Sequence, residues 1–203
     1  VAHLRQFRLP GGDAAIRRPP RQAFALLHEL GMQLPVDEGD ALSGMIDRRI
    51  NAPLTSSAGR LFDAVSWLLG LAPAEISFEG EAAIALEFAA EEGAVDLPTP
   101  IVNAGIVDWG PLVTKVTNSN EPVSALAFAF HHALARSIAD VVARTNIEHI
   151  ALVGGCFQNR LLLELAIAQI EKLGRTPIWC KQIPPNDGGI AAGQVAIAAA
   201  TSG

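Results

Sequence analysis

The sequence predicts an α/β fold with a pair of parallel strands in its last third. Two observations carry this prediction. Strand-like and helix-like segments alternate there in the order strand, helix, strand, helix, and this order implies parallel strands joined by right-handed crossovers. Half of the 203 residues are hydrophobic and 18% are charged, a composition that allows a sizeable core and excludes a wholly disordered chain.

The first half of the chain is expected to be mainly helical. The end of a strand and a loop are expected over residues 1–20. Leu61, Val65, Leu68 and Leu69 lie on one face of the third helical pattern. The four predicted helices cover residues 21–30, 37–48, 57–70 and 80–92.

The second half begins with two short strands and continues with a long helix. Residues 99–102 and 105–109 are expected to form a hairpin. Pro122 suits the first turn of the helix that follows, whose core stripe is predicted to be Leu126, Phe130, Leu134, Ile138 and Val141. The remaining predicted elements are a helix over 122–144, a strand over 149–153, a helix over 157–173, a strand over 176–180 and a helix over 188–200.

Composition excludes several classes of protein. The net charge of −6 argues against a general nucleic-acid binder, which usually carries a basic patch. Two cysteines without a CxxC motif predict neither a disulfide framework nor a thiolate zinc site, and favour the reduced cytoplasm. No signal peptide or membrane-length apolar run is visible. Because the chain begins with Val1, it is expected to be processed or cut from something longer.

The strongest local pattern is IALVGGCFQN at residues 150–159, a buried strand that ends in two glycines before a helix. Ligands of open α/β sheets bind beyond the carboxyl ends of strands. Gly154 and Gly155 would let a ligand approach the backbone, the helix N-terminus would offer N–H donors, and the Asn159 amide is expected in the first helical turn. A plain tight turn is the alternative interpretation.

The pattern PPNDGG at residues 184–189 follows the second parallel strand. Asp187 stands before a helix of small residues and is interpreted either as its N-cap or as a carboxylate ligand of a phosphate-bound metal ion. Because both glycine-containing turns follow parallel strands, they are expected at the same sheet edge, where they predict a nucleotide cleft.

A third pattern, LTSSAGRLFDA at residues 54–64, places Gly59 and Asp63 on one helix face. A carboxylate at Asp63 could accept a hydrogen bond from a ribose hydroxyl. Glu79 and Gly80 begin another helix and are expected to join this patch. The hydroxyl residues at 55–57 either cap the helix or bind a polar ligand.

Other polar residues are interpreted as structural. His131 and His132 are adjacent and therefore do not chelate one ion from a helix, so a core or surface role is expected for both. Cys156 and the tryptophans are expected to pack. The arginines at positions 17, 18 and 21 are interpreted as part of a solvated loop, with contact to an anion as the alternative.

The chain resembles the C-terminal portion of the HypF carbamoyltransferases. The resemblance is carried by FRLPGGDAAIRRP, INAPLTSSAGRLFDAVSWLLG, ISFEGEAAIALE, GGCFQNRLLLE and PPNDGGIAAGQ, and the last two are also similar to motifs of the wider TsaD-like group. It implies the second lobe of an actin/Hsp70/sugar-kinase (ribonuclease-H-like) fold with additional helices. The implied parts are a first-lobe strand end and loop (1–20), a helical part (21–95) and an α/β lobe (96–203).

The resemblance also implies an activity. Such proteins make carbamoyl-adenylate from carbamoyl phosphate and ATP, and pass the carbamoyl group to the C-terminal cysteine of HypE. Dehydration of the transferred group there gives the precursor of the cyanide ligand in [NiFe]-hydrogenase maturation. The implied nucleotide-binding residues are Gly154, Gly155 and Asn159 on the adenine side, Asp63 with Gly59 at the ribose, and more weakly Arg60, Glu79 and Gly80. Asp187 would ligate a divalent metal ion (Mg, Zn or Fe).

One departure limits this picture. The family's metal site also uses an HxxxH pair from a first lobe, and this sequence has none. We therefore expect a fragment that is inactive alone. The alternatives are an O-carbamoyltransferase or a tRNA threonylcarbamoyl-type enzyme of the same superfamily, or a non-catalytic module that docks HypE. Neither nucleic acid nor a membrane is an expected partner of the main function.

Overall fold

The computed structural model describes residues 2–201, so Val1, on which the expectation of a cut chain rests, lies outside the described residues. The helices are α1 (Asp13–Ile16), α2 (Pro19–Glu29), α3 (Gly39–Arg48), α4 (Ala58–Leu68), α5 (Glu81–Phe88), α6 (Gly110–Thr117), α7 (Val123–Ala143), α8 (Arg160–Lys172) and α9 (Ile190–Thr201). The strands are β1 (His3–Leu4), β2 (Phe7–Arg8), β3 (Leu54–Thr55), β4 (Ile101–Asn103), β5 (Ile106–Asp108), β6 (His149–Leu152) and β7 (Thr176–Trp179). Short 3-10 turns, η1 (Gly155–Gln158) and η2 (Asp187–Gly189), precede α8 and α9.

The N-terminal segment is more structured than a strand end and a loop. β1 pairs in parallel with β5, and β2 pairs antiparallel with β3. The short helix α1 follows, and α2 begins at Pro19 rather than at residue 21. Proline is favoured at the first helical positions because its missing N–H would have no partner there anyway.

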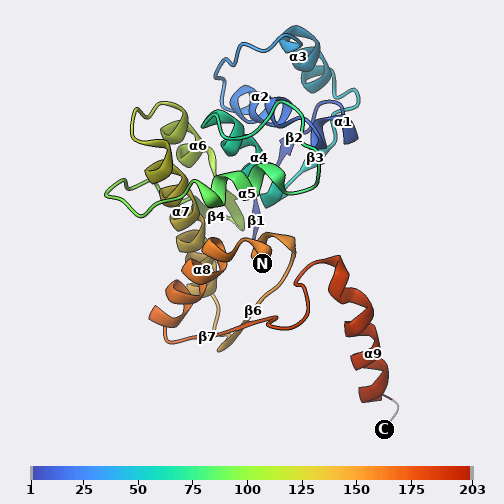
Figure 1. Ribbon diagram of the computed structural model, residues 1–203, viewed down its shortest axis with the longest axis vertical. Helices are drawn as coiled ribbons and strands as arrows, with labels where there is room; N and C mark the ends of the chain where they lie inside the picture. Colours follow the sequence, from blue (N-terminus) through green and yellow to red (C-terminus); the bar gives the residue numbers. More distant parts are fainter. Residues whose placement is uncertain (1, 202–203) are drawn as a thin grey trace.

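Helices α2 and α4 pack against each other and form much of the core (Figure 1). Of the predicted face of α4, Leu61 and Val65 are fully buried and Leu68 is partly buried against the same core. Ser57 is the N-cap, since its hydroxyl accepts from the backbone N–H of Arg60 at 3.4 Å. The capping interpretation of Ser57 is therefore correct.

The predicted hairpin is confirmed as β4 and β5, which pair antiparallel. Helix α6 follows directly and was not predicted; Leu112, Val113 and Val116 are its buried residues besides Gly110. Of the predicted stripe of α7, Leu126, Phe130 and Leu134 are buried, whereas Ile138 and Val141 are only partly buried and Val142 is buried instead. α7 is long and apolar enough to cross a membrane by length and composition, but 61% of its most apolar window is buried inside the protein, as in a core helix.

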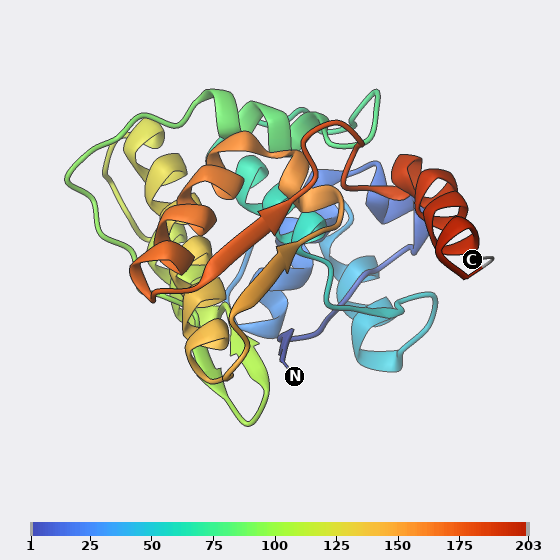
Figure 2. The ribbon, with the colours of Figure 1, turned by 90° about the horizontal axis from the view of Figure 1, so that it is seen from below.

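The predicted parallel pair is also confirmed. β6 and β7 run in the same direction and α8 connects them (Figure 2). Within residues 2–201 this pair is a separate sheet from β1-β5-β4 and β2-β3. α8 packs on α7, whereas α9 stands away from the rest and contains no buried residue (Figure 1).

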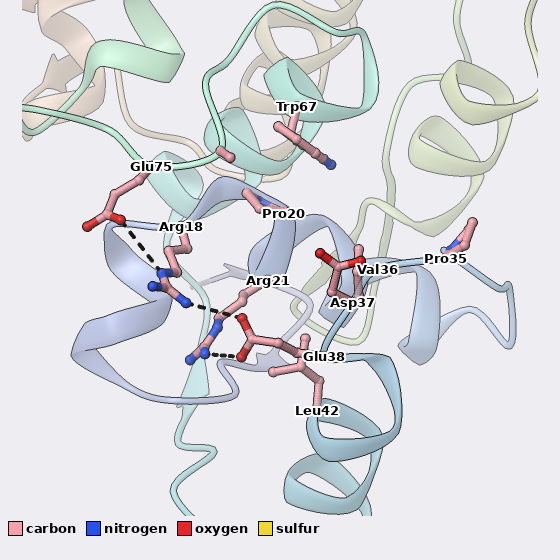
Figure 3. Close-up of a pocket in the computed structure, with 11 residues that line it drawn as sticks. Arg18, Pro20, Arg21, Pro35, Val36, Asp37, Glu38, Leu42, Trp67 and Glu75 are labelled. Carbon is pink, nitrogen blue, oxygen red and sulfur yellow. Dashed lines mark hydrogen bonds and ion pairs between the residues drawn. The ribbon is translucent and has the colours of Figure 1, made fainter.

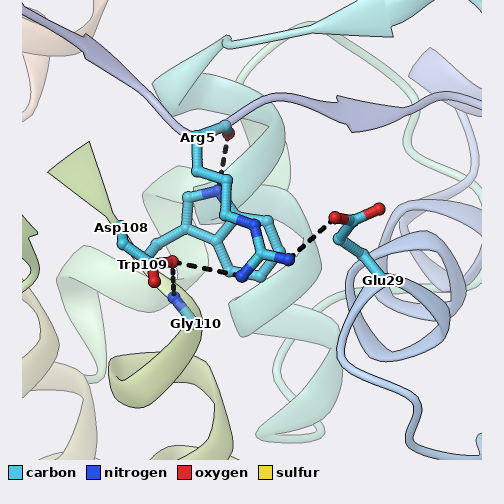
Figure 4. A network of polar contacts seen from close by, with 5 residues as sticks. All are labelled: Arg5, Glu29, Asp108, Trp109 and Gly110. Atoms are coloured by element: carbon cyan, nitrogen blue, oxygen red, sulfur yellow. Dashed lines mark hydrogen bonds and ion pairs between the residues drawn. The ribbon is translucent and has the colours of Figure 1, made fainter. Parts of the chain in front are cut away.

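A polar network ties the first strands to the α/β part (Figure 4). Arg5 contacts Glu29 at 2.8 Å and Asp108 at 3.3 Å. Its guanidinium lies over the ring of Trp109, 5.3 Å from the ring centroid. The indole N–H of Trp109 donates to the backbone oxygen of Arg5 at 2.7 Å. Trp109 is fully buried, so this network anchors the start of the chain on the core.

Candidate nucleotide site

Two of the three sequence patterns meet between α4 and the η1 turn. The backbone N–H of Gly59 contacts the Cys156 thiol, and the charges of Arg60 and Asp63 also act on it. Burial, the largest effect, raises the pKa of Cys156 above its ordinary value. Cys156 is therefore a neutral packing residue rather than a thiolate nucleophile, as the absence of a nearby base in the sequence led us to expect.

The PPNDGG pattern at residues 184–189 lies against the same turn. The backbone N–H of Gly154 donates to the carbonyl oxygen of Pro185 at 2.8 Å. A Cβ added at Gly155 would lie 3.9 Å from the Cβ of Asn186. The ends of β6 and β7 thus converge, as expected for the carboxyl ends of neighbouring parallel strands. Gly154 has a φ of 105°, a value that only glycine adopts readily.

The N-terminus of α8 differs from the expectation of free donors. One carboxylate oxygen of Glu87, on α5, accepts from the backbone N–H groups of Arg160 at 2.8 Å and Leu161 at 3.2 Å. Asn159 lies one position before the helix, as its N-cap, and its Oδ1 accepts from the N–H of Leu162 at 2.8 Å. The first donors of α8 are therefore satisfied within the protein, and a carboxylate occupies the position an anion would take.

Asn159 makes a second side-chain contact. Its Nδ2 lies 2.9 Å from Nε2 of His131, which is fully buried on α7. Nδ1 of His131 lies 2.7 Å from the carbonyl oxygen of Ala127. Both amide atoms of Asn159 are engaged by the protein, which leaves one Nδ2 hydrogen for a ligand. His132 is half-buried and contacts Gln169, so one histidine lies in the core and the other partly at the surface, as predicted.

Asp63 is buried beside Arg60 and does not face an open ligand site. Its side chain is 2% exposed and lies 2.9 Å from the guanidinium of Arg60, which is itself 13% exposed. The Arg60 guanidinium also donates to the carbonyl oxygen of Ile16 at 3.2 Å. In this structure the Asp63 carboxyl faces Arg60 rather than solvent.

The surroundings of Asp63 change its acidity. Burial raises the pKa of Asp63 to about 6, although the positive charge of Arg60 acts to lower it. The charge of Glu79 also acts on Asp63, in the raising direction, so Glu79 lies near Asp63, and its contact with a ligand stays a prediction. Gly80 precedes α5 with a φ of 87°. Within the described residues the Asp63 Oδ2 atom forms an ion pair with Arg60 but receives no well-aligned hydrogen bond.

Asp187 is exposed and begins η2. The capping interpretation of Asp187 is wrong, because its neighbour Asn186 is the residue that caps: its Oδ1 accepts from the N–H of Gly188 at 3.1 Å. Asn186 is better suited because it directly precedes the turn whose donors need a partner. Within residues 2–201 the Asp187 carboxylate therefore accepts no capping hydrogen bond.

The residues around Asp187 do not by themselves fit a metal ion. A metal site needs several side-chain ligands, and residues 2–201 contain no group of three His, Cys, Asp or Glu side chains that could hold one. We therefore derive no step of the chemistry through a metal ion.

Arg18 and Arg21 line a cavity of about 410 Å³ between α2, α3 and α4 (Figure 3). Arg18 lies 3.1 Å from Glu38 and 3.9 Å from Glu75, and Arg21 also pairs with Glu38. Arg17 is exposed. Carboxylates of the protein thus occupy the positions where an external anion was the alternative expectation.

Two residues of the site were missed by sequence reasoning. Glu87 is the second-to-last residue of α5, seventy-three positions before Arg160, whose backbone N–H it accepts from, and no local pattern connects them. His131 was assigned to packing, and its contact with Asn159 spans two helices. The only sequence signal for either was a polar residue within an apolar helical stretch.

Comparison with known proteins identifies the family. The family model described as "Carbamoyltransferase, Kae1-like Domain, second subdomain" matches residues 1–194. The chain is 36% identical over 96% of its length to Carbamoyltransferase HypF of Synechocystis sp., and 39% identical over 98% to that of Rhodobacter capsulatus. It spans only 29% and 28% of those two relatives.

Solved structures agree with this assignment. The crystal structure of full-length HypF in its phosphate- and nucleotide-bound form matches 98% of the chain with a TM-score of 0.85 and 30% identity, and the chain covers 28% of it. HypF of T. kodakarensis has the same fold, with a TM-score of 0.84 at 24% identity. The chain therefore belongs to the HypF carbamoyltransferase family, in which it corresponds to the second subdomain of the Kae1-like domain.

Proposed function

We propose that this chain forms the adenosine-holding wall of a carbamoyl-transfer site. In this proposal it binds carbamoyl-adenylate, made from carbamoyl phosphate and ATP, and presents the carbamoyl group to the C-terminal cysteine of HypE. The observation that carries the proposal is the convergence of three separate segments: the start of α4, the η1 turn and the loop before α9. The nucleotide residues implied by the family resemblance lie on these segments, or beside them in the case of Glu79 and Gly80.

The electrostatics of the turn favour a neutral part of the ligand there. Glu87 and Asn159 already occupy the first donors of α8, and the Glu87 carboxylate would repel a phosphate group. An uncharged base next to Gly154 and Gly155 needs none of these donors and is not repelled by Glu87. The two glycines also carry no side chain to exclude it. This supports the adenine side, rather than the phosphate side, as the role of Gly154, Gly155 and Asn159.

The chemistry needs little from the chain itself beyond binding and orientation. The attacking thiol belongs to HypE in this proposal, and the leaving group is AMP. The raised pKa of the half-buried Cys156 thiol agrees with a chain that supplies no nucleophile. A divalent metal ion would require ligands beyond Asp187, in keeping with a site shared with another part of the full-length protein, so the isolated chain should not transfer carbamoyl groups. We place the protein in the reduced cytoplasm, in keeping with its two free cysteines.

A relative supports the nucleotide proposal, because the full-length HypF structure of the same fold is a phosphate- and nucleotide-bound form. The test uses the full-length protein that contains this chain. Titration calorimetry with ATP should give a weaker affinity for N159A than for wild type, and a changed metal content or affinity for D187A. N118A and E121A, outside the three segments, serve as matched controls. Unchanged binding and metal content in both site variants would refute the site.

The acceptor is tested separately with radiolabelled carbamoyl phosphate and ATP. We expect label on the C-terminal cysteine of HypE and none on tRNA or on a small hydroxylated acceptor. Label on tRNA or on the small molecule instead would favour another member of the superfamily. Binding of HypE with no nucleotide effect and no transfer would favour a docking module.

A further inference from the structure

His131 is a buried titratable group that the proposed chemistry does not use. It lies on α7 with no exposed surface. The rings of Phe62 and Phe130 pack around it, with ring centroids 5.2 Å and 6.0 Å away. A polar ring in such a place normally has hydrogen-bond partners that compensate for its burial, and here those partners lead towards the η1–α8 turn.

The hydrogen bonds assign one tautomer to His131. The Ala127 carbonyl oxygen can only accept, so the hydrogen must be on Nδ1, which donates over 2.7 Å. Nε2 is then a pure acceptor, and it lies 2.9 Å from Nδ2 of Asn159. Burial lowers the pKa of His131 to about 4, so the ring keeps this acceptor at neutral pH.

The same logic fixes the orientation of the Asn159 amide. The N–H of Leu162 can only donate, so the atom facing it at 2.8 Å must be Oδ1. Nδ2 therefore faces the histidine, and each donor meets an acceptor along the series Ala127, His131, Asn159 and Leu162. A flipped amide would place a donor against the N–H and an acceptor against Nε2, at the cost of two hydrogen bonds.

We propose that His131 is the positioning residue for Asn159, holding its amide so that the second Nδ2 hydrogen points to the adenine base. This inference rests on the proposed function, because it assumes that Asn159 recognises the base. It assigns to a buried histidine a specificity role that acts through its neighbour, without contact with the nucleotide.

Two substitutions divide the two hydrogen bonds of His131. H131Q retains an acceptor near the position of Nε2 and loses the bond to Ala127. H131N keeps a donor near the position of Nδ1 and loses the acceptor that Asn159 needs. A merely structural histidine would respond alike to both changes. H132N, at the half-buried neighbouring position, is the matched control.

The measurement is the ratio of ATP to GTP affinity in the full-length protein, by titration calorimetry at neutral pH. We expect H131N to lower this ratio about tenfold, as one lost hydrogen bond would, and N159A to lower it similarly. H131Q and H132N should keep it within about twofold of wild type. In H131N/N159A the ratio should equal that of N159A alone.

The outcomes distinguish the positioning role of His131 from the proposed nucleotide-binding function. A wild-type ratio in H131N together with a lowered ratio in N159A would overturn the positioning role and leave the proposed function standing. A lowered ratio in folded H131Q would overturn it too, and this arm remains informative if H131N does not fold. A wild-type ratio in N159A would contradict the base-side role of Asn159, and with it this inference.

Discussion

The guanidinium of Arg60 lies 2.9 Å from the Asp63 carboxylate, one helical turn away on α4, and both side chains are largely buried. The pair lies beneath the η1 turn, where the charges of both residues act on Cys156. Asp63 is therefore a buried charge that is compensated mainly by Arg60 and further by a side-chain hydrogen bond from Gln22, while the nearby charge of Glu79 is unfavourable.

Removal of Arg60 should destabilise the protein through Asp63. Loss of one partner from a buried ion pair costs about 3–5 kcal/mol, and we expect R60Q near the lower end because Arg60 retains some exposure. The double variant R60Q/D63N should be less destabilised than R60Q, because no charge is then left unpaired. Urea unfolding of R60Q, D63N and the double variant measures the coupling, and additive effects would contradict it. R160Q, in the exposed pair with Glu164, is a control expected to change stability little.

Acid should act on Asp63 and His131 in opposite directions. The pKa of Asp63 is raised by burial to about 6 in the folded protein, so between about pH 6 and pH 4 the folded state binds a proton that the unfolded state does not, and acidification stabilises. The pKa of His131 is lowered by burial to about 4, so from about pH 6.5 to pH 4 only the unfolded state binds the proton, and acidification destabilises. The two effects should largely offset each other in the wild type.

Single variants should uncover each effect. The stability difference between wild type and D63N should grow in favour of wild type as the pH falls from 7 to 4.5. The difference between wild type and H131Q should move the opposite way, because the acid sensitivity of His131 is then removed. Each tenfold change in proton affinity is worth about 1.4 kcal/mol, well within the reach of urea unfolding at several pH values. Parallel pH profiles for all three proteins would contradict this assignment.

Local patterns were sufficient for the parts of the fold where one segment decides its own structure. The β6-α8-β7 unit, the β4–β5 hairpin and the buried face of α4 were predicted, because apolar periodicity and glycine turns encode them. Helix α6 was missed because it has eight residues, four of them β-branched, and these favour strands in isolation. Burial of Val113 and Val116 in the tertiary core decides in favour of the helix.

The candidate site was predictable as a set of segments but not as a set of contacts. Glycine-containing turns after parallel strands predicted that Gly154 and Asp187 would lie at the carboxyl ends of those strands. What each side chain does was decided by distant neighbours: Glu87 takes the donors of α8, and His131 takes the amide of Asn159. Asp63 was expected to face a ribose, but in this structure its side chain is buried and pairs with Arg60 on the same helix.

The two roles of Asn159 should separate in two substitutions. N159A removes the cap of α8 and should cost about 1 kcal/mol of stability. N159S keeps a side-chain oxygen for the N–H of Leu162 and should retain most of that stability. Both variants lose the amide and should weaken ATP binding in the full-length protein alike. Thermal unfolding and calorimetry on the same samples test this, and ATP affinity that follows stability would argue that Asn159 acts only as a cap.

The loop that carries Asp187 should depend on Gly189. A Cβ added at Gly189 would lie 2.6 Å from the backbone oxygen of Pro184, a contact that a rigid backbone cannot relieve without moving. G189A should therefore shift the η2 turn and destabilise it by about 1–3 kcal/mol, as overpacking usually does. In α9, Gly193 has no atom within 4 Å of an added Cβ, so G193A should be tolerated and should favour the helix by about 0.5–1 kcal/mol.

Limited proteolysis should cut residues 183–189 faster in G189A than in G193A or wild type, because a displaced turn no longer holds Pro185 against Gly154. Equal cleavage rates in all three proteins would mean that the turn tolerates a side chain at this position.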